Sequence, residues 1–508
     1  MKRRNFIKVN SQGAILGSTF LSIPLCSINE KKVKVNLVKS FNTQDYKSLL
    51  KEYTEVDHRR RLENIGFCTQ SIKGCMRKHL VTNYLPAQGL YNLGEYPART
   101  PWNPDEQDEQ ELDRLKEHGI QILQVFDDWN DSLQIFGGDK YTAVNPDGYR
   151  RFIEMAHQRG IKVLTYVSSC FIERAHPDFN QDWSLKGDNL IGFYWDMARC
   201  SPASPGWRAF VFPKYVRIMD EYGADGLYCD GGYVVNERYK NKVRPLAKDA
   251  VSAFEETPEY DGAFTDFLAL LYSEVKKRGG IFKVHVDGAQ EPQSGGLKVY
   301  DYLWVGEGVS NADSMREVVK NYSPYIVPAL DMRYTEIQNH DEPYLHSIPY
   351  MQFPVLSAGR KFTGERATIP GIKYHDGKTL QRCLKAWELW QSDPSKLHAY
   401  SGWDAVPGSA ETRPTHKKWL KRYLPIVEEG TWVWLEINET TLFEIPKPED
   451  IVASVFANRE IYLVLANYGK LEQTIKTKEN FVSTDDSSGK PKQVFSLPPR
   501  SLFILKKV

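Results

Sequence analysis

Carboxylates stand at the ends of several apolar runs in this sequence, which is where a parallel-sheet protein builds its site. Four of these ends read Phe126-Asp127-Asp128-Trp129, Cys229-Asp230-Gly231, Val286-Asp287-Gly288 and Gly306-Glu307-Gly308, and Asp331 follows a fifth run. Several acids at one mouth are unfavourable unless they bind cations, pair with bases or carry out acid–base chemistry. The pattern therefore indicates chemistry that uses paired carboxyl groups.

Hydrolysis of a glycosidic bond needs two such groups, one as nucleophile or base and the other as proton donor. We assign Asp230 as the nucleophile and Glu307 as the acid/base. They end the fourth and sixth expected strands, whose tips can approach to the roughly 5–5.5 Å of a retaining mechanism. Asp287 is the rival for either role. The alternative for Asp230 is a turn, because Asp-Gly is a common turn dipeptide.

A second group of residues is predicted to bind the substrate. Asp127 and Asp128 would accept hydrogen bonds from sugar hydroxyls and Trp129 would stack on a ring, with strand packing and a loop cap as the alternative. An Arg beyond the seventh strand would clamp a carboxylate or sulfate, or pair with a neighbouring Asp. The rest of this set is Tyr228, Asp287, Trp304, Asp331 and Arg333.

The elements that must position these residues alternate along the chain. From about residue 60, short β-branched or aromatic runs alternate with amphipathic stretches, which predicts βα units on a parallel sheet. Helices are expected over 105–118 and 147–159, and Gly119, Gly160 and Gly223 stand where left-handed C-caps form. Eight strands are expected, enough to close a barrel: 64–68, 121–126, 161–167, 224–229, 281–286, 302–305, 325–330 and one within 348–356.

The predicted fold class is α/β, a (β/α)8 TIM barrel followed by a C-terminal antiparallel β-sandwich. From Thr431 onward, alternating segments separated by turn residues indicate the second domain. The predicted divisions are a twin-arginine-type signal peptide over 1–27, an N-terminal arm over 28–59, the barrel over 60–400, a connecting segment over 401–430 and the β domain over 431–508.

The N-terminus has the pattern of an export signal. Arg3-Arg4 with Phe6 and Lys8 precedes an uncharged stretch over 11–27, as in bacterial twin-arginine signals. The protein is therefore expected in the periplasm or outside the cell. The residues before Cys26 match a lipoprotein cleavage box poorly, so no lipid anchor is predicted there. No other stretch approaches the roughly 18 apolar residues of a membrane span.

Composition narrows the function classes. The 508 residues carry a formal net charge of +1, so no global field would draw nucleic acid to the protein. The 12 Trp, 28 Tyr and 23 Phe point weakly to carbohydrate as the partner, because aromatic rings stack on sugars, and core packing is the alternative for any single ring. Motifs for nucleotide cofactors, zinc hydrolases and serine esterases are absent. No cofactor and no catalytic metal ligands are predicted, and a structural calcium ion stays open.

Two segments carry a family resemblance. Cys200-Ser-Pro-Ala-Ser-Pro-Gly-Trp-Arg208 and Tyr222-Gly-Ala-Asp-Gly-Leu-Tyr-Cys-Asp-Gly231 resemble the strand-four region of clan D glycoside hydrolases. The segment Ala175-His-Pro-Asp-Phe179, after the third expected strand, is also similar to this family. These include α-galactosidases, α-N-acetylgalactosaminidases and endo-α-N-acetylgalactosaminidase-like enzymes. The resemblance implies that Asp230 is the nucleophile. Glu307 stands where α-galactosidases have Asp. In having Glu at this position, the sequence is closer to the endo-acting relatives.

The sequence thus predicts an exported retaining α-glycosidase that cleaves galactose-type sugars in glycans or polysaccharides. The alternatives are a catalytically inactive glycan-binding barrel and an inverting glycosidase, whose carboxyl groups would lie about 6.5–9.5 Å apart. The exact sugar and linkage, endo or exo action, sulfation of the substrate and disulfide pairing stay open. The oligomeric state also stays open, and the sequence is compatible with a homo-oligomer.

Overall fold

The computed structural model describes residues 53–94, 101–132, 134, 136–192, 195–231, 258–286, 293–294, 297–305, 312–322, 325–328, 339–360, 412–485 and 489–508. The chain divides into two compact units, 1–58 and 59–508. The fold below concerns the second unit, together with the start of helix α3 (Glu55–Ser71). Among the described residues, no helix combines the length and the apolar character that crossing a bilayer requires.

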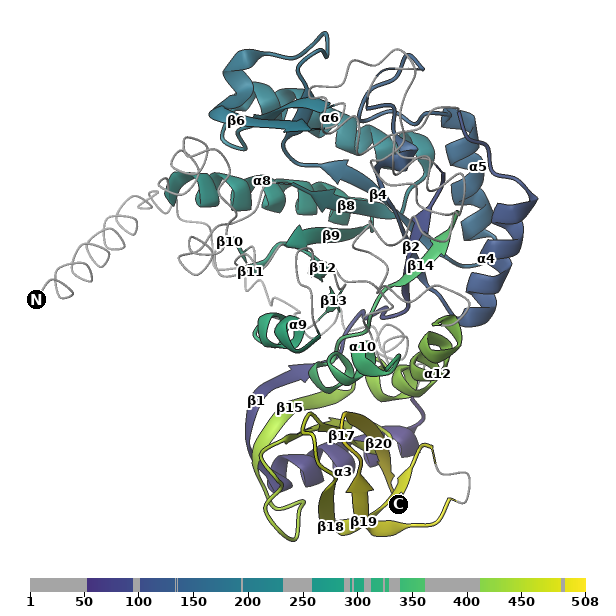
Figure 1. The fold of residues 1–508 in the computed structure, drawn as a ribbon, viewed down its shortest axis with the longest axis vertical. Coiled ribbons are helices and arrows are strands. Elements are labelled where there is room, and N and C mark those ends of the chain that lie inside the picture. The colour runs from purple at the N-terminus through teal and green to yellow at the C-terminus, as the bar shows by residue number, and fades with distance from the viewer. Residues whose placement is uncertain are drawn as a thin grey trace, which may run out of the picture. The chain divides into compact units, whose positions relative to one another are not determined.

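Eight parallel strands form the larger sheet (Figure 1). Their order is β13-β12-β9-β8-β4-β3-β2-β14, and β14 pairs in parallel with β2, so the last strand returns beside the first. This order and direction confirm the predicted (β/α)8 class. The strands are β2 (Gln88–Asn92), β3 (Ile122–Val125), β4 (Lys162–Ser168), β8 (Gly226–Asp230), β9 (Ile281–Val286), β12 (Tyr302–Val305), β13 (Ile326–Pro328) and β14 (Leu356–Gly359).

Helices lie outside these strands (Figure 1), and two of them end at the glycines where C-caps were predicted. Asp105 caps the first helix with a capping box, and Gly119 ends it in the left-handed conformation. Gly223 ends a later helix in the same way. The helices are α4 (Glu106–His118), α5 (Pro146–His157), α6 (Pro205–Tyr222), α8 (Pro258–Lys277), α9 (Ala312–Val319), α10 (Glu342–Leu345) and α12 (Arg413–Tyr423).

Two of the eight expected strands are misplaced. Residues 64–68, expected as the first strand, lie inside helix α3, and the first barrel strand is β2. The expected eighth strand within 348–356 begins as a 3-10 helix (Ile348–Tyr350), and β14 starts only at Leu356. The sequence does not predict strand β2, because the polar residues Gln88 and Asn92 at its two ends interrupt the apolar run.

A short insertion follows β4. Its strands β5 (Phe171–Glu173), β6 (Ser184–Gly192) and β7 (Trp195–Cys200) form an antiparallel sheet in the order β5-β7-β6. The backbone N–H of Cys200 donates to the carbonyl of Cys170, and the backbone N–H of Ser169 donates to that of Asp230. The insertion is therefore joined at its base to the carboxyl ends of β4 and β8. A two-stranded ribbon, β10 (Gln293–Ser294) and β11 (Leu297–Lys298), follows β9.

The strands of the C-terminal domain are hydrogen-bonded into a single seven-stranded antiparallel sheet. The sequence predicted a sandwich of two sheets. Its first strand comes from far upstream, since β1 (Ile72–Leu80) pairs with β15 (Trp432–Thr440). Residues 72–80 thus belong to this sheet, although the barrel was expected from residue 60. The remaining strands are β16 (Ile451–Ala457), β17 (Ile461–Asn467), β18 (Gln473–Ser483), β19 (Lys492–Leu497) and β20 (Ser501–Lys507), in the order β1-β15-β16-β17-β20-β18-β19.

Both faces of this sheet are buried. On β17, Leu463 and Leu465 pack in the domain's own core with Cys68 of α3, whereas Val464 and Ala466 join the core of the barrel. Successive strand residues point to opposite faces, so the alternation divides the strand between two cores. Helix α3 supplies part of the layer that a second sheet would have supplied.

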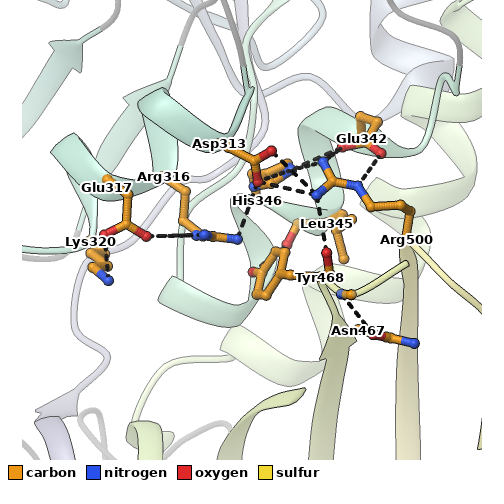
Figure 2. A network of polar contacts seen from close by, with 11 residues as sticks. Asp313, Arg316, Glu317, Lys320, Glu342, Leu345, His346, Asn467, Tyr468 and Arg500 are labelled. Carbon is orange, nitrogen blue, oxygen red and sulfur yellow. Dashed lines mark hydrogen bonds and ion pairs between the residues drawn. The ribbon is translucent and has the colours of Figure 1, made fainter. Parts of the chain in front are cut away.

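A polar network joins the sheet to the barrel (Figure 2). Arg500 donates to both oxygens of Glu342, at 2.9 and 2.5 Å, and His346 Nε2 lies 2.9 Å from Glu342 Oε2. Arg316 stacks on the Tyr468 ring, 3.9 Å from its centroid. Burial alone would raise the pKa of Glu342, but the hydrogen bonds from His346 and Arg500 outweigh it and lower the pKa to about 2.

This lowered pKa predicts that the polar network between the sheet and the barrel stabilises the fold less in acid. Folding stabilisation by Glu342 is fully present above its ordinary pKa near 4.5 and is lost as pH falls toward 2. Wild type should lose up to roughly 2–3 kcal/mol over this interval through Glu342. Urea unfolding from pH 6 to pH 3 checks this, because Glu342→Gln should be less stable at pH 6 and the difference should shrink with acid. A constant difference would contradict it.

The close pairing of β8 and β9 depends on Gly226. A Cβ at this position would lie 1.9 Å from the Ile281 carbonyl oxygen, so the two strands would have to separate. Gly226→Ala should cost roughly 3 kcal/mol or more in unfolding free energy. Gly262→Ala on α8 is the control, since nothing lies within 4 Å of its added carbon and Ala favours the helix. Chemical denaturation should show the first variant unstable and the second unharmed.

Candidate active site

Several polar and aromatic side chains point into the interior of the barrel. Lys283 of β9 donates to Gln88 of β2 at 3.0 Å, and since these strands are not neighbours, both side chains must point inward. The register pairs Tyr228 with Lys283 and His285 with Trp304, so these four side chains share the inner face. Tyr166 is paired with Tyr228 and points inward too. An ordinary barrel fills this space with branched apolar residues, so a polar interior indicates a functional site.

Asp230 lies at the mouth of this interior, as the last residue of β8. Tyr166 donates its hydroxyl to Asp230 Oδ2 at 3.0 Å, and the Gly231 N–H donates to Oδ1 at 2.6 Å. His285 Nδ1 lies 2.9 Å from the same Oδ1. The Asp230 side chain stays 22% exposed while that of His285 is 3% exposed. Three groups therefore hold a carboxylate that still has an open side.

These contacts fix the charge of Asp230. Burial would raise its pKa, but the charge and hydrogen bond of His285, followed by the bonds from Gly231 and Tyr166, lower the pKa to about 2. The carboxylate is thus ionised throughout the ordinary pH range. An ionised, oriented carboxylate can attack or stabilise a positive centre, but it cannot donate a proton near neutrality.

His285 connects this carboxylate to the aromatic side chains below it. The Tyr228 hydroxyl lies 3.0 Å from His285 Nδ1, the atom that also faces Asp230. The Trp304 ring lies 5.8 Å from that of Tyr228 and 6.4 Å from that of His285. Both Tyr228 and Trp304 are buried, at 1% and 0% exposure. The two predicted substrate-binding residues therefore form the floor under the carboxylate, and Lys283 lies 5.0 Å from the Trp304 ring centroid.

The acids after β3 are buried in the 3-10 helix η1 (Asp127–Trp129). Asp128 accepts from the N–H groups of Leu93 and Gly94, at 2.6 and 3.1 Å, and burial raises its pKa well above the ordinary value. Asp127 lies close enough to Tyr166 that its charge, after burial and Asp230, raises the pKa of the phenol. Asp128 thus acts as a cap for the loop after β2.

Trp129 belongs to the core. Its side chain is 0% exposed, stacks on Tyr149 at 5.1 Å and donates its indole N–H to the Tyr166 carbonyl at 2.9 Å. No face of the ring is left for a sugar. The packing alternative therefore describes Trp129, and its hydrogen bond instead holds the strand that carries Tyr166.

Four predicted site residues lie outside the described residues: Asp287, Glu307, Asp331 and Arg333. Asp287 directly follows β9, and Glu307 stands two residues beyond β12. In the sheet order β9 separates β8 from β12, as the assignment of Asp230 and Glu307 assumed. The pairing of these two acids stays a prediction.

Sequence reasoning gave no role to Tyr166, His285, Lys283 or Gln88. A signal was present in Ile281-Phe-Lys-Val-His-Val286, where two polar residues alternate with apolar ones inside an expected barrel strand. An alternation of this kind places polar side chains on one face. The inward face is the one that the barrel topology selects.

The Tyr166 hydroxyl should set the acid side of the pH profile. Tyr166→Phe removes a hydrogen bond to the charged form of Asp230, so the pKa of Asp230 should rise and the acid limb of kcat/KM should move to higher pH. A hydrogen bond to a charged group contributes about 1.5–3 kcal/mol, so we expect kcat/KM of Tyr166→Phe to fall by about 10- to 100-fold.

Tyr149→Phe is the matched control for this variant. The Tyr149 hydroxyl is also buried and bonds to Thr165 at 2.7 Å, but it does not contact Asp230. This variant should lose stability without moving the pH limb. An unmoved limb in Tyr166→Phe would contradict the assigned role.

Among the described residues, no cluster of three His, Cys, Asp or Glu side chains is arranged to hold a metal ion. In this structure no disulfide joins the described cysteines, which are Cys68, Cys75, Cys170, Cys200 and Cys229. Calcium binding and the absence of a cofactor stay predictions.

Comparisons with known proteins give a similarity in fold. No family model matches the chain, and no curated protein matches it. Solved structures that match include trehalulose synthase from Pseudomonas mesoacidophila (12% identity, TM-score 0.48) and trehalose-6-phosphate hydrolase from Bacillus licheniformis (12%, 0.47), each covering 84% of this chain and 100% of its own. A maltogenic α-amylase from Thermotoga neapolitana matches at 15% identity and a TM-score of 0.42, covering 83% of this chain and 96% of its own.

The likeness is one of fold alone, and none of these three structures is an α-galactosidase.

Proposed function

We propose that this protein is a retaining glycoside hydrolase that cleaves α-glycosidic bonds, with galactose-type sugars in glycans or polysaccharides as the expected substrates. The observation that carries the proposal is Asp230, an ionised carboxylate with an open side at the carboxyl end of a barrel strand. Such a group is suited to attack an anomeric carbon and to form a covalent glycosyl intermediate.

The low pKa of Asp230 supports the role of nucleophile. A proton donor needs a pKa near the working pH, whereas the contacts with His285, Gly231 and Tyr166 lower the pKa of Asp230 to about 2. The second carboxyl group must therefore come from another residue whose pKa is higher. Glu307 is the proposed donor, because it follows β12 at the same edge of the sheet as Asp230. It would protonate the leaving oxygen and then activate the water that releases the sugar.

Tyr166 and His285 act on Asp230. Their contacts orient the carboxylate oxygens and keep them charged until they bond to the substrate. When Asp230 becomes an ester in the intermediate, its negative charge disappears, and the same donors favour its return as the leaving group. Trp304 and Tyr228 close the floor, which excludes water from below the carboxylate.

A screen of aryl α- and β-glycosides together with natural glycans tests the proposal. Hydrolysis of α-glycosides with the product anomer first formed in the α configuration, followed by NMR, is the expected result. Initial release of the β anomer would replace the retaining mechanism with the inverting one. Binding of glycans without turnover of any of them would favour the inactive glycan-binding barrel. Export and extracellular action stay part of the proposal, and fractionation of cells that produce the full chain tests them.

A further inference from the structure

Two cysteines face each other at the base of the insertion after β4. Phe171 and Arg199 are partners in the antiparallel pair β5 and β7. The next pair toward the barrel is therefore Cys170 and Cys200. The Cys200 N–H donates to the Cys170 carbonyl at 2.7 Å. Residues opposed in this way have Cα atoms about 5.5 Å apart and side chains on the same face. Disulfides span Cα separations of about 4.4–6.8 Å.

Both thiols are buried beside the site. Cys170 is 2% exposed and Cys200 0% exposed. Burial, and after it the proximity of Cys170, raise the pKa of Cys200. A Cβ added to Gly231 would lie 3.2 Å from Cys170 Sγ, so this sulfur lies against the residue that donates to the Asp230 carboxylate. The pair therefore joins the insertion to the support of the proposed nucleophile.

We propose that Cys170 and Cys200 are an oxidation site and form a disulfide when the chain folds in the presence of a disulfide-bearing oxidant. The thiolate of one cysteine attacks the oxidant's disulfide, and the thiolate of the other displaces the resulting mixed disulfide. The two cysteines lose two protons and two electrons in total, and the oxidant is reduced to two thiols. Because the folded protein buries both sulfurs, the bond forms before the insertion packs against the barrel.

Cys229 is the competing partner and therefore the control. It directly precedes Asp230 on β8, is 1% exposed, and its pKa is raised by burial, then by Asp230 and by Cys170. It lies on β8, however, and not opposite Cys170 in the β5–β7 pair. The geometry favours Cys200 over Cys229 as the partner of Cys170.

Peptide mapping tests the proposal. The full chain is exported to an oxidising bacterial periplasm, its thiols are alkylated in denaturant without reductant, and the digest is read by mass spectrometry. The expected product is a peptide pair joined through Cys170 and Cys200, present also in Cys229→Ser and absent in Cys170→Ser and Cys200→Ser. Alkylation of both cysteines in the wild-type chain, or a bond that includes Cys229, would overturn the proposal.

A second measurement separates a bond from a contact. The wild-type chain is reduced with dithiothreitol in denaturant and then refolded. Its melting temperature should then be lower by about 5 °C or more, whereas that of Cys200→Ser should not change. An equal response of both proteins would also overturn the proposal. Both readouts are independent of glycosidase activity, so failure of the proposed function would not affect them.

Discussion

Asp230→Asn should abolish turnover of every substrate that the wild-type chain hydrolyses, with kcat reduced on the order of 10⁴-fold or more. Losses of this size are typical when a hydrolase loses its nucleophile. The amide keeps the shape of the side chain but cannot form the glycosyl ester, and it loses the charge that His285 and Tyr166 stabilise. Steady-state rates on an aryl α-glycoside measure the loss, and calorimetry with an unreactive sugar should show binding preserved.

Asp225→Asn is the matched control on the same strand. Asp225 directly precedes β8 at its opposite end, where its carboxylate accepts from the Val163 N–H at 2.8 Å and faces His157 at 2.7 Å. The substitution should affect stability and leave kcat near the wild-type value. Full activity in Asp230→Asn would exclude the assigned nucleophile, and sugar binding without any wild-type turnover would identify a binding protein.

Glu307→Gln should slow hydrolysis by an amount that depends on the leaving group. Loss of a general acid costs about 10²–10⁴-fold. Glycosides with poor leaving groups need that proton and should suffer the full loss, whereas activated aryl glycosides should form the intermediate readily. Without the base the intermediate should then accumulate, so added azide should restore turnover and give a glycosyl azide of retained configuration. A leaving-group series with and without azide checks this.

Asp287→Asn is the comparison that decides between the two candidate acids. If Glu307 is the acid/base, Asp287→Asn should show neither a steeper dependence on the leaving group nor rescue by azide. The reverse pattern would give the acid/base role to Asp287. Loss of activity in both variants with no dependence on the leaving group would place the proton donor elsewhere.

Much of the barrel follows from the sequence because its central strands are mainly apolar runs, several of which are followed directly by carboxylates. The β strands of residues 122–125, 162–168, 226–230, 281–286 and 302–305 all lie within or beside the expected ranges. Local pattern fails at the ends of the barrel. The first strand carries Gln88 and Asn92 on its inner face, and helix α3 contains Ile65 and Phe67 that pack on a sheet formed by distant residues. Tertiary contacts decide both cases.

The site shows the same division. Asp230 could be predicted because a single residue type at a strand end carries the signal. The side chains that set its charge could not, because Tyr166 and His285 come from two other strands and meet Asp230 only through the sheet register. Trp129 illustrates the opposite error, since an indole next to two acids suggests a sugar platform but is fully covered by Tyr149 and Tyr222.

The pairing of β1 with β15 constrains how the molecule can be made and divided. Ile72 is opposite Thr440 and Leu80 opposite Trp432, so the sheet edge leaves the ribosome long before its partner is synthesised. During synthesis of the whole barrel, β1 has no partner strand in the nascent chain. Its unpaired edge can therefore pair with other chains. An expression fragment that begins after Leu80 would in turn leave β15 bare. The barrel and the sheet are thus one unit for biosynthesis, and a clean genetic separation of the two would have to transplant β1 to the far end of the gene.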